Sequence, residues 1–215
     1  MKKIFLSLSL FSVVMVASSQ GLKLNAYSSY VFDDGFDFYN SPTDYYSGKL
    51  KGGVQWGVGL EYQVDPMAGG ELLYYYKKSE APSNFKFGTL VDEKSETFDV
   101  TQHYILVGIN SHHMTASKKA EGYAGLLLGM VITDVDAPTS GNSASNTNFA
   151  WGAKLGTDIW VSPKVAIKLQ AQILSATRAY GGDLYYGYWG PVAVPDYSTL
   201  WQFGLGGGLT FRLGQ

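Results

Sequence analysis

WGAKLGTDIWVSPKVAIKLQAQI, residues 151–173, is the stretch that decides the fold. Over residues 151–159 nearly every second residue is apolar, and the other face carries Gly, Lys154 and Asp158. After a short turn containing Pro163 the alternation resumes, with Lys168 and two glutamines on the mixed face. Two segments of period two joined by a short turn predict a β-hairpin. In a soluble sheet the charged residues would face water, whereas in a membrane barrel they would face the interior.

The first residues indicate export. Met1-Lys2-Lys3 is a basic start, and the apolar run IFLSLSLFSVVMVA follows it. Ala17 and Ser19 then supply the small residues of a cleavage site before Gln20. The run is shorter than the roughly 20 residues that a spanning helix needs. We therefore predict a signal peptide over residues 1–19 and one outer-membrane β-barrel domain over residues 20–215.

Composition narrows the class of protein. Charged residues are 16% of the chain, below the roughly 25% that is usual for soluble domains. Aromatic residues reach 15%, and there are 26 glycines and no cysteine. The missing thiols exclude disulfides and thiolate chemistry. The net charge of −2 without a basic block argues against nucleic acid as a partner.

Eight segments have the length and composition of strands, and the connections between them alternate between short and long. The strands are predicted at 22–32, 54–64, 68–77, 98–110, 121–133, 151–160, 165–173 and 200–213; the facing of 98–110 is ambiguous. The long connections are 33–52, 78–97, 134–148 and 177–199, and the short ones are 65–67, 111–120 and 161–164. Four long loops at one end are typical of a transmembrane barrel. We predict an all-β fold, an eight-stranded antiparallel up-and-down transmembrane β-barrel with short periplasmic turns and four long extracellular loops.

The two strand faces differ in a way that suits a membrane barrel better than a soluble, lipocalin-like carrier. The mixed face is mostly Gly, Ala, Tyr and Gln, which is a poor surface for water but fills a narrow interior. The other face carries aromatic residues near the long-loop end, as a membrane-interface girdle does: Tyr30, Trp56, Tyr74, Tyr76, Phe149, Trp151, Trp201 and Phe203. The inward charges are four positive and four negative, so that they can pair and plug the barrel: Lys23, Glu61, Glu71, Glu121, Lys154, Asp158, Lys168 and Arg212.

The last predicted strand, WQFGLGGGLTFRLGQ, alternates apolar residues into Phe211 and looks like the C-terminal assembly signal of a known family. With the strand and loop pattern, the chain resembles the small eight-stranded outer-membrane barrels of Gram-negative bacteria, of the OmpA transmembrane-domain and OmpX type. It departs from them by ending in Leu213-Gly214-Gln215 rather than in an aromatic residue. The resemblance implies as partners outer-membrane lipid and lipopolysaccharide, and the assembly machinery during insertion. We expect a monomer.

Candidate chemistry is sparse. Some barrels of this kind modify lipid A with a Ser, His and carboxylate set. The nearest match, Asn110-Ser111-His112-His113, falls in a predicted periplasmic turn, and we interpret it as a surface histidine pair. Asp134 and Asp136 do not have the spacing of a calcium loop, and we interpret them as part of a solvated loop. We expect no catalytic residue, no metal and no cofactor.

The connection after the seventh strand is the most distinctive one. Its Tyr and Trp residues among glycines either pack on the barrel rim or form a surface for a partner whose identity is open: Tyr180, Tyr185, Tyr186, Tyr188, Trp189 and Tyr197. We expect a structural or surface-interaction role in the cell envelope. The alternatives are a lipid-modifying enzyme and a small-solute channel.

Overall fold

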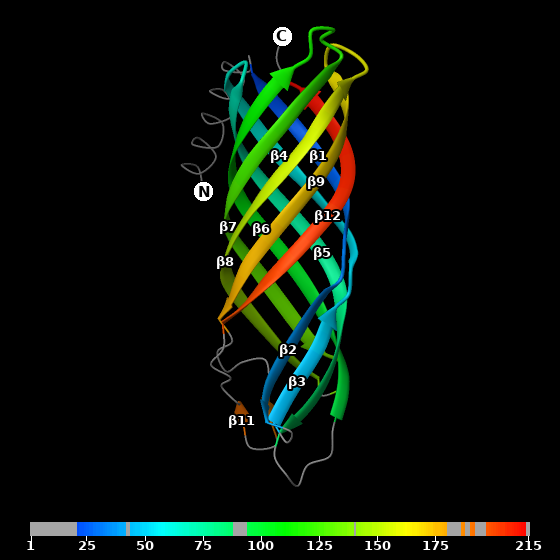
Figure 1. The fold of residues 1–215 in the computed structure, drawn as a ribbon, viewed down its shortest axis with the longest axis vertical. Coiled ribbons are helices and arrows are strands. Elements are labelled where there is room, and N and C mark those ends of the chain that lie inside the picture. The colour runs from blue at the N-terminus through cyan, green and yellow to red at the C-terminus, as the bar shows by residue number, and fades with distance from the viewer. Residues whose placement is uncertain are drawn as a thin grey trace, which may run out of the picture.

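Eight long strands form a closed antiparallel ring (Figure 1). The computed structural model describes residues 21–41, 44–87, 94–139, 141–179, 186–187, 190–191 and 197–213, so the predicted signal peptide lies outside the described residues. The ring closes because β1 pairs with both β4 and β12. This confirms the predicted eight-stranded up-and-down barrel. Its strands are β1 Leu22–Val31, β4 Gly53–Asp65, β5 Ala68–Phe87, β6 Lys94–Met114, β7 Ala120–Ala137, β8 Asn142–Trp160, β9 Val165–Ala179 and β12 Tyr197–Arg212.

Three tight turns lie at the end of the barrel where β1 begins and β12 ends (Figure 1). Polar side chains close them by accepting backbone N–H groups, which is why Asp and Ser are favoured there. Asp65 accepts from Met67 and Ala68 at 2.6 and 2.8 Å. Ser162 accepts from Val165 at 3.0 Å. We call this the short-turn end and the opposite one the long-loop end.

At the long-loop end, much of what the sequence analysis treated as loop is strand. β5 and β6 pair in register as far as Phe85 and Lys94, and β7 and β8 as far as Ala137 and Asn142. Asp134 and Asp136, expected in a solvated loop, therefore lie on β7, and that interpretation was wrong. The cause is physical. On β8, both faces of residues 142–147 are largely exposed, so no apolar alternation marks the strand.

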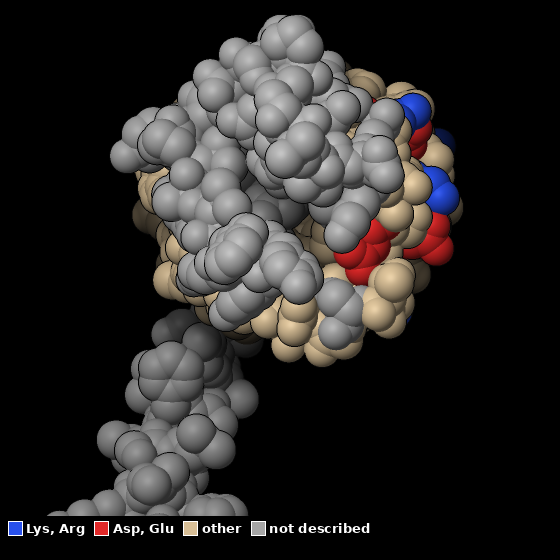
Figure 2. Space-filling model, turned by 90° about the horizontal axis from the view of Figure 1, so that it is seen from below, with Lys and Arg blue, Asp and Glu red and all other residues tan. Residues whose placement is uncertain are grey.

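The first long connection contains a hairpin of its own, β2 (Asp34–Ser41) and β3 (Asp44–Leu50), which pairs with the far end of β5. Ion pairs fasten it to the rim: Lys51 lies 2.8 Å from Glu80, and Lys49 contacts Asp33. The hydrogen bond from Lys49, together with that from the backbone of Gly52, lowers the pKa of Asp33 below its ordinary value. Viewed from this end, basic and acidic side chains lie next to one another along one side of the rim (Figure 2).

The last long connection is described only in part. Within it, Tyr186–Gly187 (β10) and Gly190–Pro191 (β11) pair as two short strands. Tyr197, expected in the loop, is the first residue of β12. The other aromatic residues named for this segment, Tyr180, Tyr185, Tyr188 and Trp189, lie outside the described residues.

The barrel is apolar outside and polar inside. Large apolar side chains such as Val107, Leu126 and Leu155 are about 60% exposed on its outer face. Buried polar and charged residues inside are as numerous as the buried apolar ones. This inverts the usual arrangement of a soluble protein, whose buried residues are mainly apolar. Within the described ranges, no helix is long and apolar enough to cross a bilayer.

Candidate functional site

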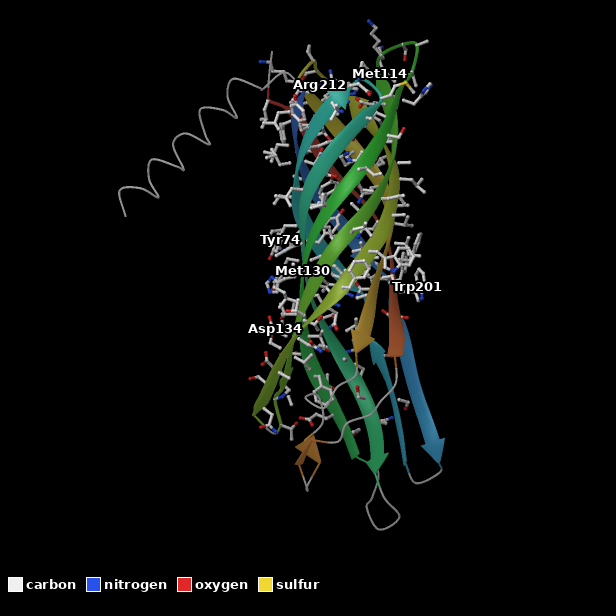
Figure 3. The ribbon with its side chains drawn as sticks, turned by 90° about the vertical axis from the view of Figure 1, so that its left-hand side faces the viewer. Tyr74, Met114, Met130, Asp134, Trp201 and Arg212 are labelled. Atoms are coloured by element: carbon white, nitrogen blue, oxygen red, sulfur yellow. The ribbon has the colours of Figure 1, made fainter. Side chains whose placement is uncertain are left out.

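The predicted girdle residues lie on the outer face and pack against one another. Trp56 contacts Tyr74 and Tyr76, with ring centroids 6.0 and 5.3 Å apart. Trp151 meets Trp201 edge to face at 5.3 Å. Tyr30, Phe149 and Phe203 are each about half exposed. Tyr74, Met130 and Trp201 lie at similar heights, far from Arg212 and Met114 at the short-turn end (Figure 3). Aromatic side chains at a common height are typical of a membrane–water interface.

The interior of the short-turn half holds the charges that the sequence analysis placed there. Seven of the eight residues are at most 2% exposed: Lys23, Glu61, Glu71, Glu121, Lys154, Asp158 and Lys168. The eighth, Arg212, lies at the rim, where its side chain is 30% exposed and its guanidinium stacks on Trp160 at 3.5 Å. Each of the four carboxylates contacts at least one basic side chain.

The most connected member of the cluster is Glu71. It accepts hydrogen bonds from Asn25 at 2.9 Å, Tyr27 at 2.5 Å and Asn110 at 3.1 Å, and it pairs with Lys154. Lys168 pairs with Asp158 at 2.9 Å, and its ammonium lies 3.9 Å from the ring centroid of Tyr123. A buried charge is stable when it is both paired and hydrogen-bonded. The cluster is therefore a fixed part of the barrel core.

His112 was predicted to lie in a surface turn, and this prediction was wrong. β6 continues to Met114, and the side chain of His112 points into the barrel and is 2% exposed. His112 Nε2 lies 2.5 Å from Glu61 and Nδ1 lies 2.9 Å from Glu121. His113, the next residue, is exposed as expected. The signal in the sequence was the alternation Tyr104, Leu106, Gly108, Asn110, His112, which is the inward face of β6.

His112 also changes the expected pairing. Glu61 lies directly across from Lys23 in the β1–β4 register, but Lys23 pairs with Glu121 on the far wall at 2.7 Å. Residues that pair in register have neighbouring backbones. Long side chains that point inward can nevertheless reach a partner on the opposite wall of a narrow lumen. Which partner a charged side chain meets therefore depends on how wide the lumen is and on which other side chains fill it. His112 occupies the place beside Glu61.

Replacing His112 by alanine should lower the free energy of unfolding by about 1–3 kcal/mol, because buried Glu61 loses its hydrogen bond to the imidazole and buried Glu121 loses a basic neighbour. His113→Ala, a matched change on the other face of the same strand, should alter it by less than about 0.5 kcal/mol. Urea unfolding of the refolded barrel, followed by tryptophan fluorescence, measures both. Equal effects for the two variants would contradict a buried His112.

Between the charges and the long-loop end the interior is filled by two further groups. Glutamines and tyrosines bond to one another across the lumen: Gln170 contacts Tyr75 and Tyr123 at 3.1 and 2.8 Å, and Gln202 contacts Gln102 at 2.7 Å. An apolar cluster packs between them: Tyr27, Leu73, Tyr75, Tyr104, Leu106, Leu127, Val131, Ala150, Leu174 and Ala176. A second apolar cluster around Phe98 and Val100 fills the extension of the barrel at the long-loop end. β6 contributes to both, so its facing, left open by the sequence, is now fixed.

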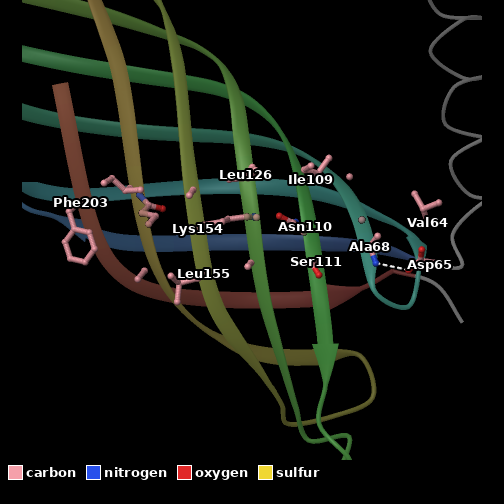
Figure 4. Close-up of a pocket in the computed structure, with 18 residues that line it drawn as sticks. Val64, Asp65, Ala68, Ile109, Asn110, Ser111, Leu126, Lys154, Leu155 and Phe203 are labelled. Atoms are coloured by element: carbon pink, nitrogen blue, oxygen red, sulfur yellow. Dashed lines mark hydrogen bonds between the residues drawn. The ribbon is translucent and has the colours of Figure 1, made fainter. Parts of the chain in front are cut away.

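The outer face carries a shallow apolar groove of about 970 Å³ that crosses β5 to β9. Small residues such as Ala124 and Ala171 line it together with the larger Leu126, Leu155 and Phe203, which Figure 4 labels. The groove is almost free of polar atoms. The groove lies in the part of the outer surface that would face the hydrocarbon of a bilayer.

Ser111 and His112, the hydroxyl and imidazole of the candidate motif for a lipid-modifying enzyme, do not come together. Ser111 is exposed on the outer face, whereas His112 points inward, so they lie on opposite sides of the wall. Among the described residues there is also no group of three or more His, Cys, Asp or Glu side chains that could hold a metal ion.

No family model matches the sequence, and no curated protein matches it. Among solved structures, the crystal structure of Neisserial surface protein A (NspA) is similar, with a TM-score of 0.57 and 13% identity over 90% of this chain and 98% of that one. Outer membrane protein W of E. coli gives a TM-score of 0.48 and 17% identity, over 90% and 97% of the two chains. At this identity only the fold is shared. The chain has the fold of the small outer-membrane β-barrels.

Proposed function

We propose that this chain is an integral outer-membrane protein of a Gram-negative cell envelope, closed to solutes by its own side chains, with a structural or surface-interaction role. The observation that carries the proposal is the inverted barrel, apolar outside and polar inside, bounded by an aromatic girdle. A soluble protein rarely exposes an apolar surface of that extent. The similar fold of NspA supports the same placement.

The filled interior supports closure. Paired charges, a glutamine and tyrosine network and an apolar cluster all lie in the interior of the barrel. A selective pore lines itself with one sign of charge, and a hydrophobic constriction stops water and ions. Here the clustered charges are of both signs, and they contact one another in ion pairs such as Lys23–Glu121, Lys154–Glu71 and Lys168–Asp158. We therefore expect the role to lie at the surface of the barrel and at its long-loop end, where lipopolysaccharide, other lipids or a cell-surface partner would be met.

Cell fractionation tests the placement. The protein should be recovered with outer membranes, and unboiled samples should migrate differently from boiled ones on a gel, because the folded barrel resists detergent. Recovery in the soluble periplasm without a heat-dependent shift would refute the membrane proposal and favour a soluble carrier.

Planar bilayer recording tests closure. Wild-type protein should give only small or rare conductance steps, because paired charges, hydrogen-bonded glutamines and buried apolar side chains occupy the interior. Lys154→Met, which keeps the volume but removes a charge, should not open a pore. Large and stable steps with strong ion selectivity in the wild type would instead establish the channel alternative.

A further inference from the structure

His112 links two strands that are not neighbours in the ring. Its Nε2 atom lies 2.5 Å from Glu61 of β4, and its Nδ1 atom lies 2.9 Å from Glu121 of β7. β5 and β6 separate β4 from β7. The three side chains are buried inside the barrel. Met114, two residues further along β6, lies at the short-turn end, so the link is close to that end of the lumen (Figure 3).

The two contacts favour a hydrogen on each nitrogen of the imidazole. An ionised carboxylate only accepts hydrogen bonds, and a neutral imidazole has a single N–H group. If Nε2 donates to Glu61, a neutral ring would place the lone pair of Nδ1 2.9 Å from a carboxylate oxygen of Glu121, which is repulsive. The protonated ring has an N–H group on both sides and a positive charge between two negative ones.

The two carboxylates leave no better place for this proton. One oxygen of Glu121 lies 2.7 Å from Lys23, and the other accepts from the indole of Trp160 at 3.0 Å. One oxygen of Glu61 faces the imidazole, and the other accepts from Asn25 at 3.2 Å. A hydrogen on any of these oxygens would meet an N–H group. The proton therefore belongs on the imidazole.

Glu61 depends on the charge of the imidazole. Of the described basic side chains, His112 alone is in ion-pair contact with Glu61. Lys77 is also buried, but it lies further along β5, at the level of the girdle residue Tyr76. Among the described residues of the short-turn half, four buried carboxylates face three buried lysines: Glu61, Glu71, Glu121 and Asp158 against Lys23, Lys154 and Lys168. A buried charge without a partner is costly, and the imidazolium supplies the fourth positive charge.

Loss of the proton should therefore destabilise the barrel. A histidine in an unfolded chain has a pKa of about 6.5 and is neutral above that pH. A folded barrel that keeps the imidazolium then binds one proton more than the unfolded chain, so the free energy of unfolding falls as the pH rises. The stabilisation is complete below about pH 6.5. It is lost as the pH rises to the point at which His112 releases its proton in the folded barrel.

We propose that His112 is a buried imidazolium that ties β4 to β7 across the lumen, and that raising the pH removes this tie and destabilises the barrel. The inference goes beyond the proposed function, because it concerns the interior and needs no surface partner. The charged and titratable groups around the imidazole are Glu61 of β4, Glu121 and Tyr123 of β7, Lys23 of β1, and Glu71 of β5, which shares Asn25 with Glu61.

The pH dependence of unfolding tests the proposal. Wild type and His112→Gln are refolded in micelles and unfolded by urea at several values between about pH 6 and 9, with tryptophan fluorescence as the signal. Glutamine can donate to Glu61 but carries no charge, and the surrounding groups stay in place. The unfolding equilibrium constant of the wild type should rise relative to that of the variant by up to about tenfold for each pH unit above about 6.5. His113→Gln, the matched change on the outer face of β6, should keep the wild-type pH dependence.

Nitrogen NMR of the barrel with isotope-labelled histidine measures the charge directly. At neutral pH both ring nitrogens of His112 should give the signals of N–H groups, and raising the pH should convert the ring to the neutral form. His103→Gln and His113→Gln identify the signals of the other two histidines. The same pH dependence in wild type and His112→Gln, or a neutral His112 ring at neutral pH, would overturn the proposal. If His112→Gln does not refold, the NMR titration of the wild type decides alone.

Discussion

Replacing Glu71 by alanine should lower the free energy of unfolding by about 3–5 kcal/mol, the usual consequence of removing one partner of a buried ion pair. Glu71 is at most 2% exposed and accepts from three neutral side chains besides pairing with Lys154. Without its carboxylate, Lys154 keeps a charge inside the barrel, with only the hydroxyl of Tyr27 within reach at 3.2 Å.

The measurement is urea unfolding of the refolded barrel, followed by tryptophan fluorescence and by the heat-dependent gel shift. Asp136→Asn, an exposed change on the outer face, is the control and should shift the free energy by less than about 0.5 kcal/mol. The double variant Glu71→Leu with Lys154→Met should recover part of the loss, because apolar pairs often replace buried ion pairs without cost. A loss below about 1 kcal/mol in Glu71→Ala would mean that water reaches the cluster and that the interior is not closed.

The regions that could be predicted from sequence are the parts of the strands that lie between the short turns and the girdle. There the outer side must be apolar, so a period of two marks each strand, and the short turns follow from Asp65, Ser162 and Pro163. The facing of β6 could not be predicted, because this strand is apolar on both faces, with Tyr104 and Leu106 inside and Ile105 and Val107 outside. Beyond the girdle the outer face is no longer apolar. The strands over residues 134–148 were therefore not predicted.

The functional clusters show a second limit of sequence reasoning. The inward set of charges followed from alternation, but which partner each charge meets did not, because the lumen brings together strands far apart in the sequence. His112 was missed because Ser-His-His reads as polar and turn-like, although one face of it is buried.

Gly208→Val should prevent the barrel from closing. β12 joins β1 at the seam of the ring through Gly206-Gly207-Gly208, and a Cβ atom at Gly208 would lie 1.8 Å from the carbonyl oxygen of Ala26. The obstructing atom belongs to the backbone, so no side-chain rotation relieves the clash. Overpacking of this kind typically costs 1–3 kcal/mol and occasionally more, and here it falls on the pairing that completes the fold.

Gly70→Val is the matched control, because a Cβ atom at Gly70 would meet nothing within 4 Å. Valine is favoured in strands, so the control should fold as well as the wild type. The measurement is the fraction of protein that shows the heat-dependent gel shift after refolding into micelles. We expect it to be nearly complete for the wild type and for Gly70→Val and nearly absent for Gly208→Val. Normal folding of Gly208→Val would show that β1 and β12 can separate at this point without loss of the barrel, and the seam would then be a site of movement rather than of closure.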